Sequence, residues 1–326
     1  MKLDAVGFGA LNMDKLFRVN RIAYEDEESY ITGSSESFGG SAANTVVGLS
    51  RLGMKTGFIG KVGPDREGSL LHNNLKNENI DIKGVILTEN GRSGTVNGYV
   101  DSEGQRALYV DPGVNDCIGE NEVDKDYVDS TKVLHITSFV GNFNEKSIDT
   151  QKNILNEISS KVCVSFDPGR LYIERGVEFL DKFFTHTDIL LINQAELNLL
   201  TTGKIEYSRI STGMTETQLN TDKIQAEYGI EIVAVKMGDK GSFVSSGEES
   251  YFTDAFDVPC LDTTGAGDAF NAGFLHGFIT GESLKQSAIE GNYVASRCIT
   301  EHGATDGLPD IAKLENFINR NQIHFS

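Results

Sequence analysis

The sequence Leu261-Asp262-Thr263-Thr264-Gly265-Ala266-Gly267-Asp268-Ala269-Phe270 places a flexible Gly-Ala-Gly turn directly before an apolar run. The run predicts a helix over residues 268–280. Its N-terminus would offer backbone N–H groups without partners at the positive end of the helix dipole, which attracts anions. The glycines would let a phosphate approach the backbone closely. Gly265, Ala266, Gly267 and Asp268 are therefore a candidate anion hole with a carboxylate on the first helical turn.

A carboxylate beside an anion hole is the arrangement that phosphoryl transfer to a hydroxyl requires. The amides neutralise the transferring group, and the carboxylate, here Asp268, accepts the hydroxyl proton. The alternative interpretation is an ordinary helix start with an acidic first turn. Other nucleotide-binding patterns are missing from the sequence. It contains no G-x-x-x-x-G-K-[ST] loop, and Gly7-Phe8-Gly9-Ala10-Leu11-Asn12 ends in Asn where a dinucleotide-binding loop has Gly.

The ten-residue stretch as a whole resembles the C-terminal signature of the ribokinase/PfkB family of carbohydrate kinases. Further segments resemble the family's motifs and follow the family's order along nearly the whole chain. They are Asn12-Met13-Asp14, Gly39-Gly40-Ser41-Ala42-Ala43-Asn44, residues 60–68, Asn193-Gln194-Ala195-Glu196 and residues 236–241. The resemblance implies a kinase that transfers the γ-phosphoryl group of ATP to a hydroxyl of a sugar or sugar-like acceptor. Asp268 would be the general base, and the 265–268 amides the anion hole.

The resemblance also implies which residues bind the acceptor: Asn12, Asp14, Gly40, Ser41 and Asn44. Their alternative roles are structural, a loop aspartate and a helix entry with Ser41 as N-cap. Many ribokinases have lysine where this chain has Ser41, so we expect free ribose not to be the preferred acceptor. Two further functions stay open. One is a nucleoside kinase acting on a 5′-hydroxyl, and the other is a non-catalytic sugar-binding relative, which the retention of Asp268 disfavours.

For the nucleotide, the resemblance implies a site made of Asn193, Glu196, Lys236, Gly238, Gly241 and Asn292, with Glu196 holding Mg²⁺ through water. Competing interpretations are a helix-capping Asn193–Glu196 pair, an ordinary glycine turn after the strand at 232–235, and a polar helix residue at 292. Asp262 and Thr264, with a second loop at 298–307, match a family site for a monovalent cation such as K⁺, which is held largely by backbone carbonyls.

The fold class follows from alternating patterns along the chain. Apolar runs predict strands at 5–9, 56–60, 133–136, 162–166, 189–192 and 232–235. Helical patterns lie between them at 41–52, 68–77, 147–159, 194–200 and 221–228. This βαβ alternation predicts a three-layer α/β/α sandwich with a mostly parallel sheet, as a single domain over residues 1–326. The regions at about 15–37 and 93–110, with a hairpin of 95–100 and 106–110, predict a small β-sheet. In the family, such a sheet is a lid and often a dimer surface.

The composition indicates which classes of binding partner are excluded. The 326 residues carry a net charge of −19, which argues against nucleic-acid and anionic-membrane binding. No apolar run approaches the length of a membrane span, and the sequence opens on a strand pattern without a signal core. The four cysteines form no C-x-x-C, and the histidines do not cluster, so we expect free thiols, no zinc and a cytoplasmic protein.

Overall fold

The computed structural model describes residues 2–202 and 214–321. Its main sheet has nine strands in the order β13-β12-β11-β10-β9-β8-β1-β4-β5. All neighbouring strands pair in parallel except β12 and β13, which form an antiparallel edge. In chain order the strands are β1 (Leu3–Phe8), β4 (Thr56–Val62), β5 (Asp81–Leu87), β8 (Thr131–Thr137), β9 (Cys163–Asp167), β10 (Ile189–Asn193), β11 (Ile232–Lys236), β12 (Ser242–Ser245) and β13 (Ser250–Thr253).

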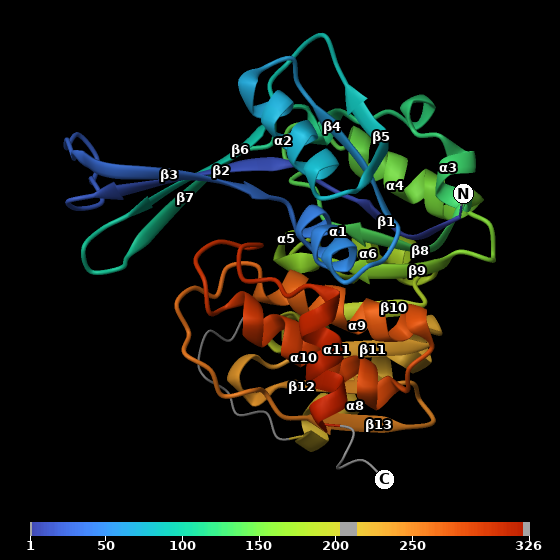
Figure 1. Cartoon of the computed structure of the whole chain (residues 1–326). Coiled ribbons are helices and arrows are strands. Elements are labelled where there is room, and N and C mark those ends of the chain that lie inside the picture. Colours follow the sequence, from blue (N-terminus) through green and yellow to red (C-terminus); the bar gives the residue numbers. More distant parts are fainter. Residues whose placement is uncertain (1, 203–213, 322–326) are drawn as a thin grey trace.

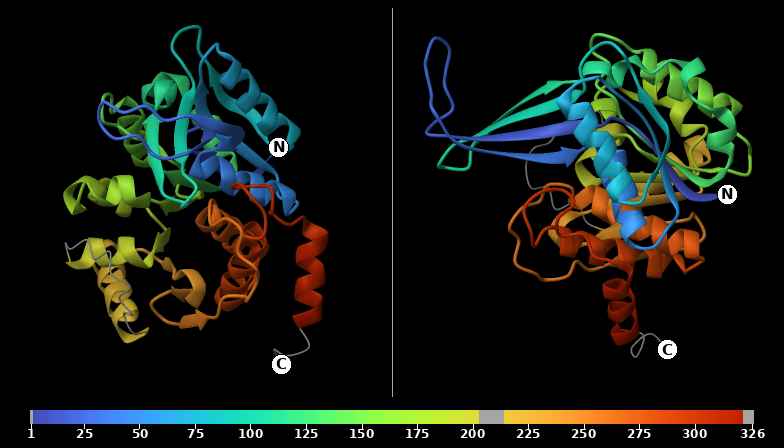
Figure 2. Two further views of the ribbon diagram at one scale, coloured as in Figure 1. Left: turned by 90° about the vertical axis from the view of Figure 1, so that its left-hand side faces the viewer. Right: turned by 45° about the horizontal axis from the view of Figure 1, so that its top comes forward.

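Helices cover both faces of this sheet, which confirms the predicted α/β/α sandwich (Figures 1 and 2). On one face lie α3 (Lys125–Asp129), α4 (Lys146–Glu157), α5 (Gly169–Ile173), α6 (Val177–Phe184), α7 (Gln194–Thr202) and α8 (Met214–Tyr228). On the other lie α1 (Ser41–Arg51), α2 (Arg66–Asn77), α9 (Ala266–Thr280), α10 (Leu284–Cys298) and α11 (Ile311–Asn321). Among the described helices, none is long and apolar enough to cross a membrane.

The two faces have separate apolar cores because the central strands are buried on both sides. Phe8, Ile136 and Phe166 point into the core under α4 to α8. On the other face, Phe58 packs under α1 and α2, and Phe274 of α9 packs against the strands. Strands buried this way have near-continuous apolar sequences, so the six predicted strands are confirmed within two residues at each end.

The sequence prediction missed several peripheral elements. The edge strands β5 and β13 are only partly buried, so their sequences lack an apolar run. The predicted helix at 221–228 begins earlier, at Met214. Helices α6, α10 and α11 were not predicted, although Leu180 and Phe183 of α6 are fully buried. Helix α6 has only eight residues, and α10 buries mostly small and polar side chains, so neither sequence shows a clear apolar helical pattern.

A second sheet of four strands has the order β3-β2-β6-β7. Its strands are β2 (Asn12–Val19), β3 (Ile31–Gly39), β6 (Gly94–Val100) and β7 (Arg106–Asp111). The hairpin predicted over 95–110 is confirmed as β6 and β7. The sheet projects from the body of the molecule as a long ribbon (Figure 1). Its base joins the main body beside α1, because β3 leads directly into that helix. Its role as a lid, and the single-domain boundary at 1–326, stay predictions.

Candidate active site

The predicted helix after the glycine turn is α9, and Gly265 is its N-cap. Gly265 has φ 76°, in the left-handed region that favours glycine. A Cβ there would lie 2.6 Å from the Cα of Ala304, so a side chain cannot be placed without moving the neighbouring loop. The turn therefore holds the N-terminus of α9 close against the loop at 298–307. Asp268 lies on the first turn of the helix, as predicted.

The carboxylate of Asp268 is held by α1. Its Oδ1 accepts a hydrogen bond from Ser41 Oγ at 2.6 Å, and its Oδ2 accepts one from Asn44 Nδ2 at 2.8 Å. Burial raises the pKa of Asp268 to about 6, and the bonds from Ser41 and Asn44 act in the opposite direction. The N-terminus of α1 itself depends on Gly40 with φ 111°, where a Cβ would meet the carbonyl oxygen of Ala10. Ser41 and Asn44, predicted as acceptor-binding residues, thus orient the predicted base.

Asp14 of β2 lies near Asp268. Burial raises the pKa of Asp14 to about 7, and the negative charge of Asp268 adds to the rise. Gly39 of β3 lies opposite Asn12 of β2 in the smaller sheet. It leaves room for the Asp14 carboxylate, because a Cβ at Gly39 would lie 2.3 Å from Asp14 Oδ2. No donor among the described residues bonds to the Asp14 carboxylate, so its lone pairs remain free for a ligand. In contrast, Asn12 Oδ1 accepts a hydrogen bond from Asn115 Nδ2 at 2.9 Å.

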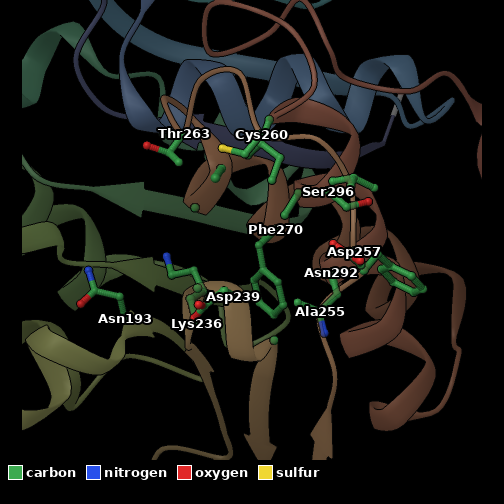
Figure 3. A pocket seen from close by; sticks show the side chains of 18 residues that line it. Asn193, Lys236, Asp239, Ala255, Asp257, Cys260, Thr263, Phe270, Asn292 and Ser296 are labelled. Carbon is green, nitrogen blue, oxygen red and sulfur yellow. The ribbon is translucent and has the colours of Figure 1, made fainter. Parts of the chain in front are cut away.

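A cavity of about 710 Å³ adjoins the α9 N-terminus, where Ala266 and Gly267 line it, and Figure 3 shows its side chains. Most residues predicted for the nucleotide line it: Asn193, Lys236, Gly238, Gly241 and Asn292, together with Ala266 and Gly267 of the anion hole. Several apolar lining residues were not predicted: Ala255, Phe256, Val258, Phe270, Ala295 and Ile299. A large cavity with apolar walls and a few polar groups is typical of ligand sites. Phe270 ends the ten-residue stretch that marks the glycine turn, whereas the other five lie in segments without a motif, so no local pattern marked them as lining a ligand site.

Asn193 and Glu196 form a reciprocal pair at the start of α7. The Asn193 N–H donates to Glu196 Oε2 at 3.0 Å, and the Glu196 N–H donates to Asn193 Oδ1 at 2.9 Å. The helix-capping interpretation of this pair is therefore confirmed. Burial raises the pKa of Glu196 to about 7, with a further rise from the charge of Asp167. Glu196 is not among the residues that line the cavity, whereas Asn193 is.

Lys236 and Asn292 are both hydrogen-bonded within the protein. Lys236 Nζ lies 2.6 Å from Asp167 Oδ2, a residue that the sequence analysis did not single out. Asn292 Nδ2 donates to the carbonyl oxygens of Thr253 and Asp254 and to Thr253 Oγ1, which joins α10 to the end of β13. Asp167 directly follows the apolar core of a predicted strand. The position of a carboxylate at the carboxyl end of a parallel strand was a signal that could have identified it.

The loops implied for a monovalent cation do meet. Asp262 Oδ1 accepts from the Thr264 N–H and hydroxyl, and Asp262 Oδ2 accepts from the Gly303 N–H at 3.0 Å. Burial raises the pKa of Asp262, but the bonds from Gly303 and Thr264 outweigh it and hold the pKa below its usual value. The Cys298 thiol donates toward the carbonyl oxygens of Thr264 and Ala304. The side chain of Asp262 therefore joins the two loops.

The backbone N–H groups of the candidate anion hole differ in whether they already donate a hydrogen bond within the protein. The Ala266 N–H donates to the Thr263 carbonyl oxygen at 3.2 Å. The N–H groups of Gly265, Gly267 and Asp268 have no acceptor in the part of the chain that the structure describes. Free amides at the positive end of a helix, bordered by a carboxylate and a large cavity, are the arrangement expected of an α/β protein that transfers a phosphoryl group.

Comparisons with known proteins identify the family. The sequence pattern of the pfkB family carbohydrate kinases matches residues 2–311, and the chain belongs to this family of phosphotransferases, which act on hydroxyl groups. It is 41% identical over 263 residues to a sugar kinase of Archaeoglobus fulgidus that is described as uncharacterized, with 81% of this chain and 98% of that protein covered. It is 31% identical to an ATP-dependent ribose-1-phosphate kinase of Halopiger xanaduensis, with 91% and 92% covered. Ribokinase from Thermotoga maritima shares the fold with a TM-score of 0.83 and 25% identity, over 97% of this chain and 99% of that one.

Proposed function

We propose that this protein transfers the γ-phosphoryl group of ATP to a hydroxyl of a sugar or sugar-like acceptor, with Asp268 as general base. One observation carries the proposal. The Asp268 carboxylate is oriented by Ser41 and Asn44, is close enough to Asp14 for its charge to raise the pKa of that group, and directly follows Gly267, which lines a cavity of about 710 Å³. An acceptor held by Asp14 and a nucleotide held in the cavity would therefore meet at the first turn of α9.

The chemistry follows from this order of groups. The acceptor oxygen attacks the γ-phosphorus, the bond from that phosphorus to the bridging oxygen breaks, and ADP leaves. The hydroxyl proton goes to the Asp268 carboxylate, which at neutral pH is largely ionised because its pKa is about 6. The free N–H groups of Gly267 and Asp268 stabilise the charge on the transferring group.

We propose that Glu196, which is hydrogen-bonded to the cavity-lining Asn193, holds Mg²⁺ through water. Carboxylate oxygen is the ligand type that this ion prefers, and a nearby cation would favour the ionised form that burial and Asp167 disfavour. When bound, Mg²⁺ neutralises negative charge on the phosphates. For K⁺, we propose the meeting point of the Asp262–Thr264 turn and the 298–307 loop. The support is that Asp262 joins these two loops through its bond to Gly303.

The acceptor class is best tested with a panel. Incubation with ATP and ribose, ribose 1-phosphate, other sugars or nucleosides, with ADP release as the signal, would identify the acceptor. Ribose 1-phosphate belongs in the panel because the Halopiger xanaduensis relative is named for it. We expect a sugar or sugar phosphate other than free ribose to have the highest kcat/KM, since Ser41 is short and already bonded to Asp268. A nucleoside in first place would favour the alternative acceptor class.

We also propose that the smaller sheet covers the acceptor and joins two copies of the chain. Asp14 lies in that sheet, two residues from Leu16. Exposed apolar side chains on it include Leu16, Leu108, Tyr109 and Val110, which is the composition of a surface that becomes covered. Light scattering on the purified protein would test the dimer, and a monomer at micromolar concentration would contradict it. A cytoplasmic location stays a prediction.

A further inference from the structure

A buried lysine on the cavity wall is held by two side chains that no sequence motif singled out. Lys236 Nζ lies 2.6 Å from Asp167 Oδ2 and donates to Asn271 Oδ1 at 3.2 Å. Asn271 Nδ2 in turn donates to the same Asp167 oxygen at 2.7 Å. The three side chains form a closed triangle, which we name the lysine clamp. Its members are largely buried, with side-chain exposures of 13% for Lys236 and 8% for Asp167.

The clamp lies beside the first turn of α9. Lys236 ends β11, Asp167 ends β9, and both strands flank β10 in the sheet. Asn271 lies on α9, three residues after Asp268. A Cβ built on Gly267 would be 3.6 Å from Lys236 Nζ, so the ammonium is a neighbour of the anion hole. Both residues line the cavity, and Lys236 can be seen on its wall in Figure 3.

The hydrogen bonds leave part of the ammonium available. A lysine ammonium has three donor hydrogens, and Asp167 and Asn271 take two of them among the described residues. Burial alone would lower the pKa of Lys236, but the charges of Asp167 and Glu196 outweigh it, so the group stays cationic. A fixed cation with a free donor, next to free amides on a cavity wall, suits an anionic ligand group.

We propose that Asp167 and Asn271 are positioning residues that hold the Lys236 ammonium against the terminal phosphoryl group of the nucleotide. The inference rests on the proposed function for the identity of the nucleotide site. The competing explanation is a buried ion pair that only stabilises the fold, since breaking such a pair is costly wherever it lies. The two explanations differ in one respect. A purely structural pair can be replaced by neutral side chains without loss of turnover, whereas a working ammonium cannot.

The experiment compares Lys236→Met, Asp167→Asn, Asn271→Ala and the neutral double variant Asp167→Asn/Lys236→Met. Calorimetry with ATP·Mg²⁺ and with ADP·Mg²⁺ measures how much the terminal phosphoryl adds to affinity. We expect Lys236→Met to remove most of that difference and to lower kcat about 10²-fold, as for loss of one donor to a reacting anion. Asp167→Asn and Asn271→Ala should each lower kcat about 10-fold, as for loss of a residue that orients a ligand.

The double variant decides between the explanations. We expect its melting temperature to exceed that of Lys236→Met, because no carboxylate is left buried and unpaired, while its kcat stays as low. A double variant that regains wild-type kcat, or single variants that bind ATP and ADP in the wild-type ratio, would overturn the inference. The binding ratio needs no acceptor. It therefore tests the clamp even if the wild-type protein phosphorylates nothing in the panel, which is the outcome that would sink the proposed function instead.

A matched control is available elsewhere in the sheet. Lys61 of β4 pairs with Glu122 at 2.6 Å and is similarly buried, with a side-chain exposure of 9%, but it does not line the cavity. Lys61→Met should lower the melting temperature while leaving kcat and the ATP-to-ADP binding ratio within about twofold of wild type, because its cost is structural. Equal losses of kcat in Lys61→Met and Lys236→Met would count against the clamp.

Discussion

The two sides of Asp268 are built in opposite ways. On the proposed nucleotide side, the ends of β10 and β11 and the helices α9 and α10 line a cavity, and the buried acid Asp167 at the end of β9 is paired with Lys236. On the proposed acceptor side, Asp14 comes from the smaller sheet and Asp268 from the main body, and among the described residues neither carboxylate forms an ion pair, although the more distant charge of Lys236 acts on Asp268. The pKa of Asp167 is therefore held down despite burial, while those of Asp14 and Asp268 are raised.

This contrast indicates what each side is suited to bind. A cationic group and free amides suit the phosphates of a nucleotide, and the apolar walls suit its base. Two carboxylates with free lone pairs suit neutral hydroxyl donors, because hydroxyls can bond to them without bringing another negative charge. A sugar presents several such hydroxyls. The difference between the sides thus supports the direction of transfer, from the cavity toward Asp14.

We expect the largest loss of kcat from a change at Asp268, the residue at which the two sides meet. Asp268→Asn keeps the shape of the side chain but removes its ability to accept a proton. We expect kcat to fall by roughly 10² or more, the usual contribution of a general base. ATP affinity, measured by calorimetry, should stay within a few-fold of wild type, because the change lies outside the cavity lining. Turnover near the wild-type rate would show that Asp268 is not the base.

Next in size is the effect of filling the anion hole. A Cβ on Gly267 makes only an ordinary contact with Lys236 Nζ, at 3.6 Å, but the added methyls of valine extend beyond it. Gly267→Val should therefore lower kcat about 10²-fold by obstructing the amides, in a protein that still folds. Gly267→Ala is the matched control and should lose far less. If valine and alanine variants were equally active, the turn would not face the phosphoryl group.

On the acceptor side, Asp14→Ala should affect the acceptor and spare the nucleotide. Loss of a charged partner for a bound hydroxyl costs roughly 1.5–3 kcal/mol, which corresponds to a rise in acceptor KM of about 10- to 100-fold. The KM for ATP should change by no more than about twofold, because Asp14 does not line the cavity. Steady-state kinetics with each substrate varied in turn measures both values. Equal changes in the two would contradict the division into sides.

The smallest effect expected at neutral pH is in the pH profile. Because burial raises the pKa of Asp268 to about 6, this carboxylate becomes protonated as the pH falls through that value. Activity should drop about tenfold per pH unit below it. Asp14, with a pKa of about 7, adds an earlier decline in kcat/KM for the acceptor. In the Asp14→Asn variant, the decline in kcat/KM near pH 7 should vanish, and the decline in activity near pH 6 should remain. Activity that does not change between pH 7 and pH 5 in wild type would refute both assignments.

The raised pKa values of Asp14 and Asp268 also predict how the free energy of unfolding depends on pH. A carboxyl whose folded pKa lies above its unfolded pKa binds its proton more tightly in the folded state, so it adds stability as the pH falls through the folded pKa. Asp14 and Asp268 should therefore make wild type gain stability, relative to Asp14→Asn/Asp268→Asn, between about pH 7 and pH 5. Urea unfolding at several pH values measures this gain. An unchanged difference across that range would contradict the raised values.

The sequence by itself determined the central strands, the glycine turn and the residues that surround Asp268. Strands such as β10 are apolar up to their last residue, here Asn193, because helices cover both faces, and that pattern is local in the chain. The turn at Gly265 is also local, because its backbone conformation requires glycine. Ser41, Asn44 and Asp268 were expected at one site through their motifs, and they do meet, although 227 positions separate Ser41 from Asp268.

Only the tertiary structure decided how these groups are charged and paired. Whether Asn193 and Glu196 face a ligand or cap α7 depends on hydrogen bonds that their spacing permits in either case. Asp167 and Asn271 carry no motif, and they reach Lys236 because the ends of β9 and β11 and the side of α9 converge. A pKa is likewise set by burial and by neighbours distant in sequence, so the sequence names the acids but cannot say which is paired.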